Sequence, residues 1–139
     1  MKLSKVLSGL TACILASSSL AGCIIVDNDD HYHAGYGSLT VALTIDGRAD
    51  SFQCFDYDVD GLVVRVEDEA GFVTEASADC DELGLTLFDL PGGYYDVETW
   101  LVDFDGFQKS DVVRVESVDV YGDTDTLVEV DFPWNWIDP

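Results

Sequence analysis

From residue 38 onward, apolar and polar residues alternate with a period of two, the repeat of a β-strand that buries one face. Glycine, proline and aspartate interrupt the alternation about every 8–15 residues, and no window holds a sustained helical period. The pattern predicts about seven strands, at 38–45, 62–67, 72–77, 84–90, 94–101, 113–116 and 127–132, with 118–120 either continuing the sixth or pairing separately. Strands with one apolar face predict an all-β fold, a single antiparallel, immunoglobulin-like β-sandwich.

The first 22 residues follow a different pattern. Lys2 and Lys5 precede an apolar run over residues 6–20, which is interrupted only by small Gly, Ser and Thr residues. These are the charged and apolar regions of a secretory signal. About 15 apolar residues reach only about 22 Å as a helix, which is short of a bilayer core. We therefore expect a signal peptide here and not a membrane-spanning helix.

The segment Leu20-Ala21-Gly22-Cys23 resembles the lipobox of bacterial lipoproteins. The resemblance implies cleavage after residue 22 and a diacylglyceryl group, with acyl chains such as palmitate, on Cys23. The membrane would then be a partner through this lipid anchor. By analogy with Gram-negative lipoproteins, Ile24 after the cysteine favours the outer membrane. The sequence does not decide whether the domain faces the periplasm or the outside. The alternative is a soluble chain whose Cys23 forms a disulfide.

Cleavage removes 22 of the 139 residues and leaves 117, enough for one domain with its own core. Residues 24–37 contain polar residues and glycines and show no apolar periodicity, as in a flexible tether. We therefore expect a signal peptide at 1–22, a lipidated cysteine and tether at 23–37, and the β-sandwich at 38–139. His31 and His33 fall in the tether, where a solvated linker is favoured over a metal chelate.

The predicted mature chain is strongly acidic. All 28 acidic residues follow the cleavage site, against four basic residues, for a formal charge of about −24. Such an excess repels nucleic acid and anionic lipid headgroups and attracts divalent cations or basic partners. Because the apolar content is also high, we expect the acids to cover a folded domain.

Export leaves Cys54 and Cys80 as an even pair in an oxidising compartment. A disulfide between them would close about 27 residues and stabilise the fold by roughly 3 kcal/mol. A metal-binding pair or a reactive thiol is the alternative, although neither a nearby histidine nor a CxxC spacing supports it.

The sharpest candidate site is formed by Asp56, Asp58 and Asp60, which with Gly61 and Glu67 match the EF-hand calcium-loop pattern. The flanks disagree with an EF-hand, because residues 62–67 alternate as a strand. Three interpretations stay open: a solvated acidic loop, which is favoured, a non-helical Ca²⁺ loop made by the three aspartates, and an EF-hand. Two further acidic turns, at 103–106 and 119–125, would strengthen the Ca²⁺ interpretation if one end of the sandwich gathered all three.

Trp134 and Trp136 follow the last predicted strand. Exposed indole rings bind sugars by stacking and anchor protein partners, so the pair is a candidate ligand-binding site. The alternative, which we favour, is that the tryptophans fold back over an open end of the core.

Catalysis finds little support in the sequence. Both histidines precede residue 34, and the HExxH, GxSxG and phosphate-loop motifs are absent.

The segment Leu90-Pro91-Gly92-Gly93-Tyr94-Tyr95-Asp96-Val97 resembles the L-P-x-G-x-Y-x-V turn of carboxypeptidase-regulatory-like, prealbumin-like modules. This resemblance implies a non-catalytic sandwich.

We therefore expect a non-enzymatic binding or structural module of the cell envelope, without a cofactor. The alternative is a Ca²⁺-dependent surface module that binds a glycan or an envelope protein. An enzyme would require an open cleft with two facing carboxylates.

Overall fold

The computed structural model describes residues 34–138; the predicted signal peptide, Cys23, His31, His33 and most of the predicted tether lie outside the described residues. The elements in chain order are β1 (Tyr36–Ile45), α2 (Phe52–Asp56), β2 (Gly61–Asp68), β3 (Val73–Asp79), the 3-10 turn η1 (Cys80–Glu82), β4 (Gly84–Pro91), β5 (Gly93–Val102), β6 (Val113–Val120), β7 (Asp125–Phe132) and the 3-10 turn η2 (Trp134–Trp136). The seven predicted strands are confirmed, and residues 113–120 form one continuous strand.

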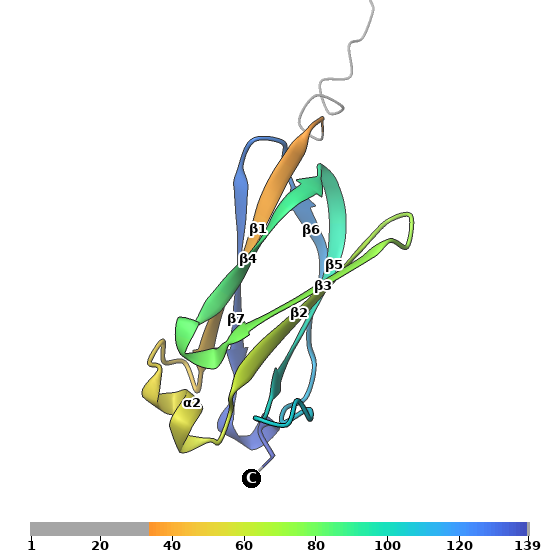
Figure 1. Cartoon of the computed structure of the whole chain (residues 1–139). Coiled ribbons are helices and arrows are strands. Elements are labelled where there is room, and N and C mark those ends of the chain that lie inside the picture. Colours follow the sequence, from red (N-terminus) through yellow and green to blue (C-terminus); the bar gives the residue numbers. More distant parts are fainter. Residues whose placement is uncertain (1–33, 139) are drawn as a thin grey trace, which may run out of the picture.

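The strands form two sheets that pack as a β-sandwich, as predicted (Figure 1). One sheet has the order β4-β1-β7 and the other β3-β2-β5-β6. One pairing differs from the antiparallel prediction, because β1 and β7 run parallel from Ser38 opposite Asp125 to Ile45 opposite Phe132. Parallel neighbours need a crossover connection, and here the four strands of the second sheet lie within the connection between β1 and β7.

The core lies between the sheets and follows the predicted alternation. In β1, the alternate residues Leu39, Val41, Leu43 and Ile45 are each at most 1% exposed. The facing strands β2 and β5 contribute a second set of fully buried residues, Leu62, Val64, Val66, Val97 and Leu101. Two apolar faces that interdigitate in this way are what hold a sandwich together.

Two turns share the sequence pattern Asp-x-x-Gly-Phe, at residues 68–72 and 103–107. In each, the leading aspartate accepts hydrogen bonds from the backbone N–H groups of the second and fourth residues after it, at 2.9–3.0 Å. The glycine has a positive φ in both, +85° in Gly71 and +83° in Gly106, a conformation that favours glycine. Each turn leaves its final phenylalanine exposed. The two turns thus have the same hydrogen-bond pattern and the same glycine conformation at different places in the fold.

The described chain enters the sandwich at one end, where β1 begins, which we call the proximal end (Figure 1). The opposite end, which we call the distal end, consists of residues 46–60, 80–83, 103–112 and 133–138. Helix α2, η1, the β5–β6 loop and the C-terminal η2 therefore lie together at the distal end (Figure 1). Within residues 34–138, no helix is both long and apolar enough to cross a membrane.

Candidate functional site

Exposed aromatic side chains gather at the distal end. They are Phe52, Phe55, Phe104, Phe107, Trp134 and Trp136, with exposed fractions between 41% and 87%. The proximal end and the strands near it also expose aromatic residues, among them Phe72 and Phe88. Aromatic exposure alone therefore does not single out one end as the candidate binding surface. The local shape of the surface distinguishes the two ends.

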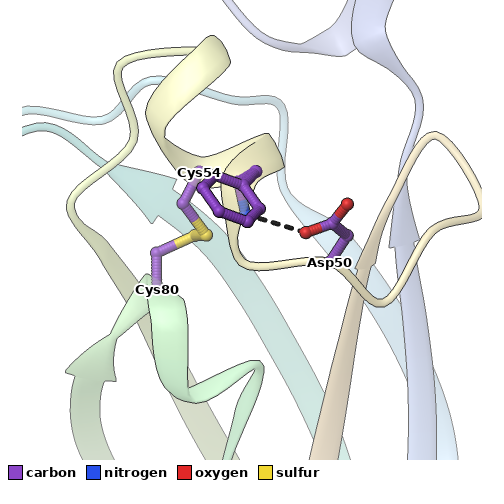
Figure 2. The surroundings of a disulfide bond; sticks show 4 residues. Asp50, Cys54 and Cys80 are labelled. Atoms are coloured by element: carbon purple, nitrogen blue, oxygen red, sulfur yellow. Dashed lines mark hydrogen bonds between the residues drawn. A yellow bond between two sulfur atoms is a disulfide. The ribbon is translucent and has the colours of Figure 1, made fainter.

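Helix α2 places two phenylalanines side by side on the outer surface. Phe52 and Phe55 are three residues apart, so they share one helix face, and they are 75% and 85% exposed. Gln53 and Cys54 point inward and are buried. The Asp50 carboxylate accepts a hydrogen bond from the Phe52 N–H at 3.0 Å, which satisfies one backbone donor at the start of the helix (Figure 2). The sequence pattern did not predict this helix, because five residues are too few to show a period.

The predicted disulfide between Cys54 and Cys80 is confirmed, with its Cα atoms 5.9 Å apart (Figure 2). It excludes the alternatives of a metal-binding pair and a reactive thiol. Both cysteines are buried, at 5% and 1% exposure. Because Cys54 lies in α2 and Cys80 begins η1, the bond fixes these two elements against each other.

A hollow of about 660 Å³ opens between α2 and η1. We call it the α2–η1 hollow; it is lined by Ser51, Phe52, Cys54, Phe55, Val59, Asp60, Asp79, Cys80 and Asp81. The two phenylalanines, the disulfide and Val59 supply an apolar surface, and the three aspartates supply carboxylates beside it. A largely apolar concavity with a few polar groups is the usual form of a binding site.

The three aspartates of the predicted calcium loop occupy different settings. Asp56 ends α2, Asp58 adopts a left-handed backbone with φ of 53°, and the Asp60 N–H donates to the Val102 carbonyl at 2.9 Å. Within the described part of the chain, no group of three or more His, Cys, Asp or Glu residues is arranged to hold a metal ion. The structure therefore does not bring the three carboxylates together, and Ca²⁺ binding stays a prediction.

The three acidic turns also do not share one end of the sandwich. Asp103 lies at the distal end, where its carboxylate caps the β5–β6 turn. Asp123 and Asp125 lie at the proximal end, next to the start of β1. There the Asp125 carboxylate accepts a hydrogen bond from the Ser38 hydroxyl at 2.7 Å. The condition that would have favoured a shared Ca²⁺ site is thus not met.

The C-terminal segment docks through Ile137, whereas the sequence favours the tryptophan pair for this role. Ile137 is 8% exposed and forms a β-bridge with Ser110. Trp134 is 60% exposed and Trp136 41%. The Trp136 carbonyl accepts a hydrogen bond from the Asp111 N–H at 2.9 Å, so the backbone is fixed. The indole rings remain accessible to a ligand.

A second hollow, of about 410 Å³, lies on the outer face of the four-stranded sheet and includes Glu67, Asp68, Asp96 and Arg114 in its lining. Asp96 accepts hydrogen bonds from the Ser117 N–H and from Arg114, both at 3.1 Å. The Ser117 hydrogen bond first, and then Arg114, hold the pKa of Asp96 below its usual value. Both contacts favour the ionised form of the Asp96 carboxylate.

Two other carboxylates of this second hollow are also engaged. Asp68 caps the β2–β3 turn through the N–H groups of Ala70 and Phe72. Glu67 lies 3.6 Å from the Arg65 guanidinium. Each of the three carboxylates in this hollow therefore has a partner, either a backbone N–H group of a turn or strand or an arginine.

Tyr95 fixes the turn that carries the Leu-Pro-x-Gly resemblance. Its hydroxyl donates to the Pro91 carbonyl at 2.6 Å. Burial, and to a lesser extent the charge of Asp68, raise the pKa of Tyr95 above its usual value. This residue is a structural anchor between β4 and β5 at the proximal end.

No protein-family model matches the chain, and no curated protein matches it. Among solved structures, the chain is similar to a DUF1812 protein of Bacteroides thetaiotaomicron, which is described as a candidate polysaccharide-binding protein. The two superimpose with a TM-score of 0.41 and 16% identity, over 66% of this chain and 46% of that chain. This chain thus spans less than half the length of the similar protein.

Proposed function

We propose that this protein is a non-enzymatic binding module of the bacterial cell envelope, anchored through lipid on Cys23 and presenting its distal end to a ligand. The observation that supports the proposal most is the α2–η1 hollow, which combines an open apolar surface with two neighbouring exposed phenylalanines. Single exposed phenyl rings are common on protein surfaces, whereas neighbouring apolar side chains around a concavity are typical of an interaction site.

The direction of the chain supports the distal end as the binding end. The described residues start at Ala34, just before β1, at the end of the sandwich opposite α2. A tether that leaves from this point would hold the proximal end toward the membrane. The distal end would then face away from the anchor and be open to a partner.

The chemistry of the described residues favours binding over catalysis. No histidine follows residue 33, so the described residues contain no imidazole to act as a general base. In the second hollow, Glu67, Asp68 and Asp96 are held by backbone hydrogen bonds or by arginine. The α2–η1 hollow presents apolar groups and carboxylates, which suit recognition.

The proposal can be tested with the full-length chain, produced with its leader in a Gram-negative host and extracted from membranes in detergent. Binding of chitohexaose, cellohexaose and short basic peptides would be measured by calorimetry. The distal variant combines Phe52→Ala with Phe55→Ala. The proximal variant combines Phe72→Ala with Phe88→Ala, which are 75% and 72% exposed and provide a matched control.

We expect at least one probe to bind and to lose about tenfold or more in affinity in the distal variant, as is typical of aromatic binding residues. The proximal variant should bind like the wild type. Equal losses in both variants would reject the distal end as the binding surface. Cleavage of a probe by the chain, abolished by one Asp or Glu substitution, would overturn the non-enzymatic assignment.

A further inference from the structure

We propose that the α2–η1 hollow binds a cationic segment of a protein partner, in which an arginine or lysine lies next to an apolar side chain. This inference rests on the proposed binding function and names the ligand class of the same site. It draws on three independent features of the hollow: its apolar wall, the hydrogen-bonding character of its rim, and the charge around it.

The apolar wall is exposed, and a disulfide restrains the helix that carries it. Phe52 and Phe55 project from the same face of α2, and the Cys54–Cys80 disulfide holds this wall against η1 (Figure 2). A preorganised apolar wall gains affinity because little flexibility is lost on binding. Phenyl faces also attract cations through the quadrupole of the ring. An apolar side chain next to a cation therefore fits the wall.

The rim accepts hydrogen bonds far more than it donates them. The charged side chains that line the hollow are Asp60, Asp79 and Asp81, and all three are exposed. Ionised carboxylates only accept, and the Ser51 hydroxyl is the one side-chain donor among the lining residues. Arginine and lysine only donate, so they match such a rim. A sugar hydroxyl can also donate to these carboxylates, so an uncharged glycan is the competing ligand in the test.

The surrounding charge selects for a cation as well. Residues 34–138 carry 25 acidic side chains against the four basic residues Arg48, Arg65, Lys109 and Arg114. Arg65 and Arg114 are paired with carboxylates on the four-stranded sheet. Arg48 and Lys109 lie at the distal end but outside the residues that line the hollow. A field of this sign attracts basic segments over long distances and repels anionic ligands. It also disfavours a second copy of this chain as the occupant.

The test uses three synthetic peptides of equal length, built from four repeats each of Arg-Gly-Leu, Arg-Gly-Gly and Glu-Gly-Leu, with blocked ends. Chitohexaose serves as the uncharged glycan. Affinities for the full-length chain in detergent would be measured at 50 and 150 mM NaCl. The Arg-Gly-Gly peptide reports general charge attraction, so the ratio between the two arginine peptides isolates the contribution of the apolar wall.

We expect the Arg-Gly-Leu peptide to bind about tenfold tighter than Arg-Gly-Gly and the Glu-Gly-Leu peptide not to bind. Phe52→Ala with Phe55→Ala should remove the difference between the two arginine peptides, whereas Phe72→Ala with Phe88→Ala should preserve it. Asp79→Asn with Asp81→Asn should weaken both arginine peptides. Asp89→Asn with Asp123→Asn removes the same charge at the proximal end and should have a smaller effect.

Three results would overturn the inference. Equal binding of Arg-Gly-Leu and Arg-Gly-Gly would mean that only diffuse charge attraction operates. Binding of chitohexaose but not of the arginine peptides, lost in the Phe52→Ala, Phe55→Ala variant, would reject the cationic ligand while preserving the proposed binding function. Binding of no probe at the distal end would count against both.

Discussion

Cys54 and Cys80 lie 26 residues apart in the chain and join helix α2 to the turn η1 beneath the exposed phenylalanines. The bond therefore has two consequences. It restricts the unfolded chain, and it fixes the relative position of the two walls of the α2–η1 hollow. The stability of the domain and the shape of its candidate binding surface depend on the same covalent link.

Loss of this disulfide should destabilise the domain. For the Cys54→Ala, Cys80→Ala variant we expect a loss of roughly 3 kcal/mol in the free energy of unfolding. The disulfide joins residues 26 positions apart and so lowers the entropy of the unfolded chain. Guanidinium denaturation of the oxidised and reduced wild type and of the variant would measure it. An unfolding midpoint unaffected by reduction would show that the bond does not carry this stabilisation.

Tyr95 should contribute a pH-dependent part of the stability. Tyr95→Phe removes the hydrogen bond to the Pro91 carbonyl, at a cost of about 1 kcal/mol at neutral pH. Because the folded pKa of Tyr95 is raised, its contribution is complete below the unfolded pKa of about 10 and is lost as the pH rises through the folded value.

The stability difference between wild type and Tyr95→Phe should therefore be constant from neutral pH to about pH 10 and shrink above it. Urea denaturation across this range would measure the difference. Tyr36→Phe serves as the control, because Tyr36 is 64% exposed. A difference that grew above pH 10 would contradict the raised pKa.

Divalent cations should act on this domain without selectivity. Since residues 34–138 contain no cluster of ligands arranged for a metal ion, we expect millimolar Ca²⁺ and Mg²⁺ to raise the melting temperature by similar small amounts through screening of its negative charge. Differential scanning fluorimetry with a chelator as reference would show this. A rise of several degrees with Ca²⁺ alone, lost in Asp58→Asn with Asp60→Asn, would instead support the calcium loop.

Membrane attachment should depend on Cys23. In a Gram-negative host, Cys23→Ala should shift the chain from the membrane pellet to the soluble fraction and abolish its labelling with an alkyne analogue of palmitate, because the lipid supplies the anchor. Cys13→Ala changes a cysteine inside the predicted signal peptide and should leave both readouts unchanged. Retention of label and membrane attachment in Cys23→Ala would refute the lipid anchor.

The strands were predictable because burial of one face imposes a period of two on the sequence, as in Leu39 to Ile45. The parallel pairing of β1 with β7 was not, since it depends on which distant strands meet. The Asp-x-x-Gly-Phe turns left a readable signal at 68–72 and 103–107, where a repeated aspartate and glycine specify one turn geometry.

The candidate site was only partly predictable. The cysteine pair was identified from its compartment and number. Phe52 and Phe55 gave no signal, because an apolar residue in a sequence looks the same whether it lies in the core or at the surface. Helix α2 is too short to show a period, and its position depends on the disulfide and on the Asp50 hydrogen bond.

The most direct test of the central claim is to map the binding surface by NMR. The isotope-labelled, oxidised chain would be titrated with the Arg-Gly-Leu peptide while backbone amide shifts are followed. We predict that the largest shifts fall in residues 51–60 and 79–82, around the α2–η1 hollow, and that residues 68–72 at the matched proximal turn stay unchanged. Shifts centred on the proximal end, or spread evenly over the acidic surface, would contradict the account.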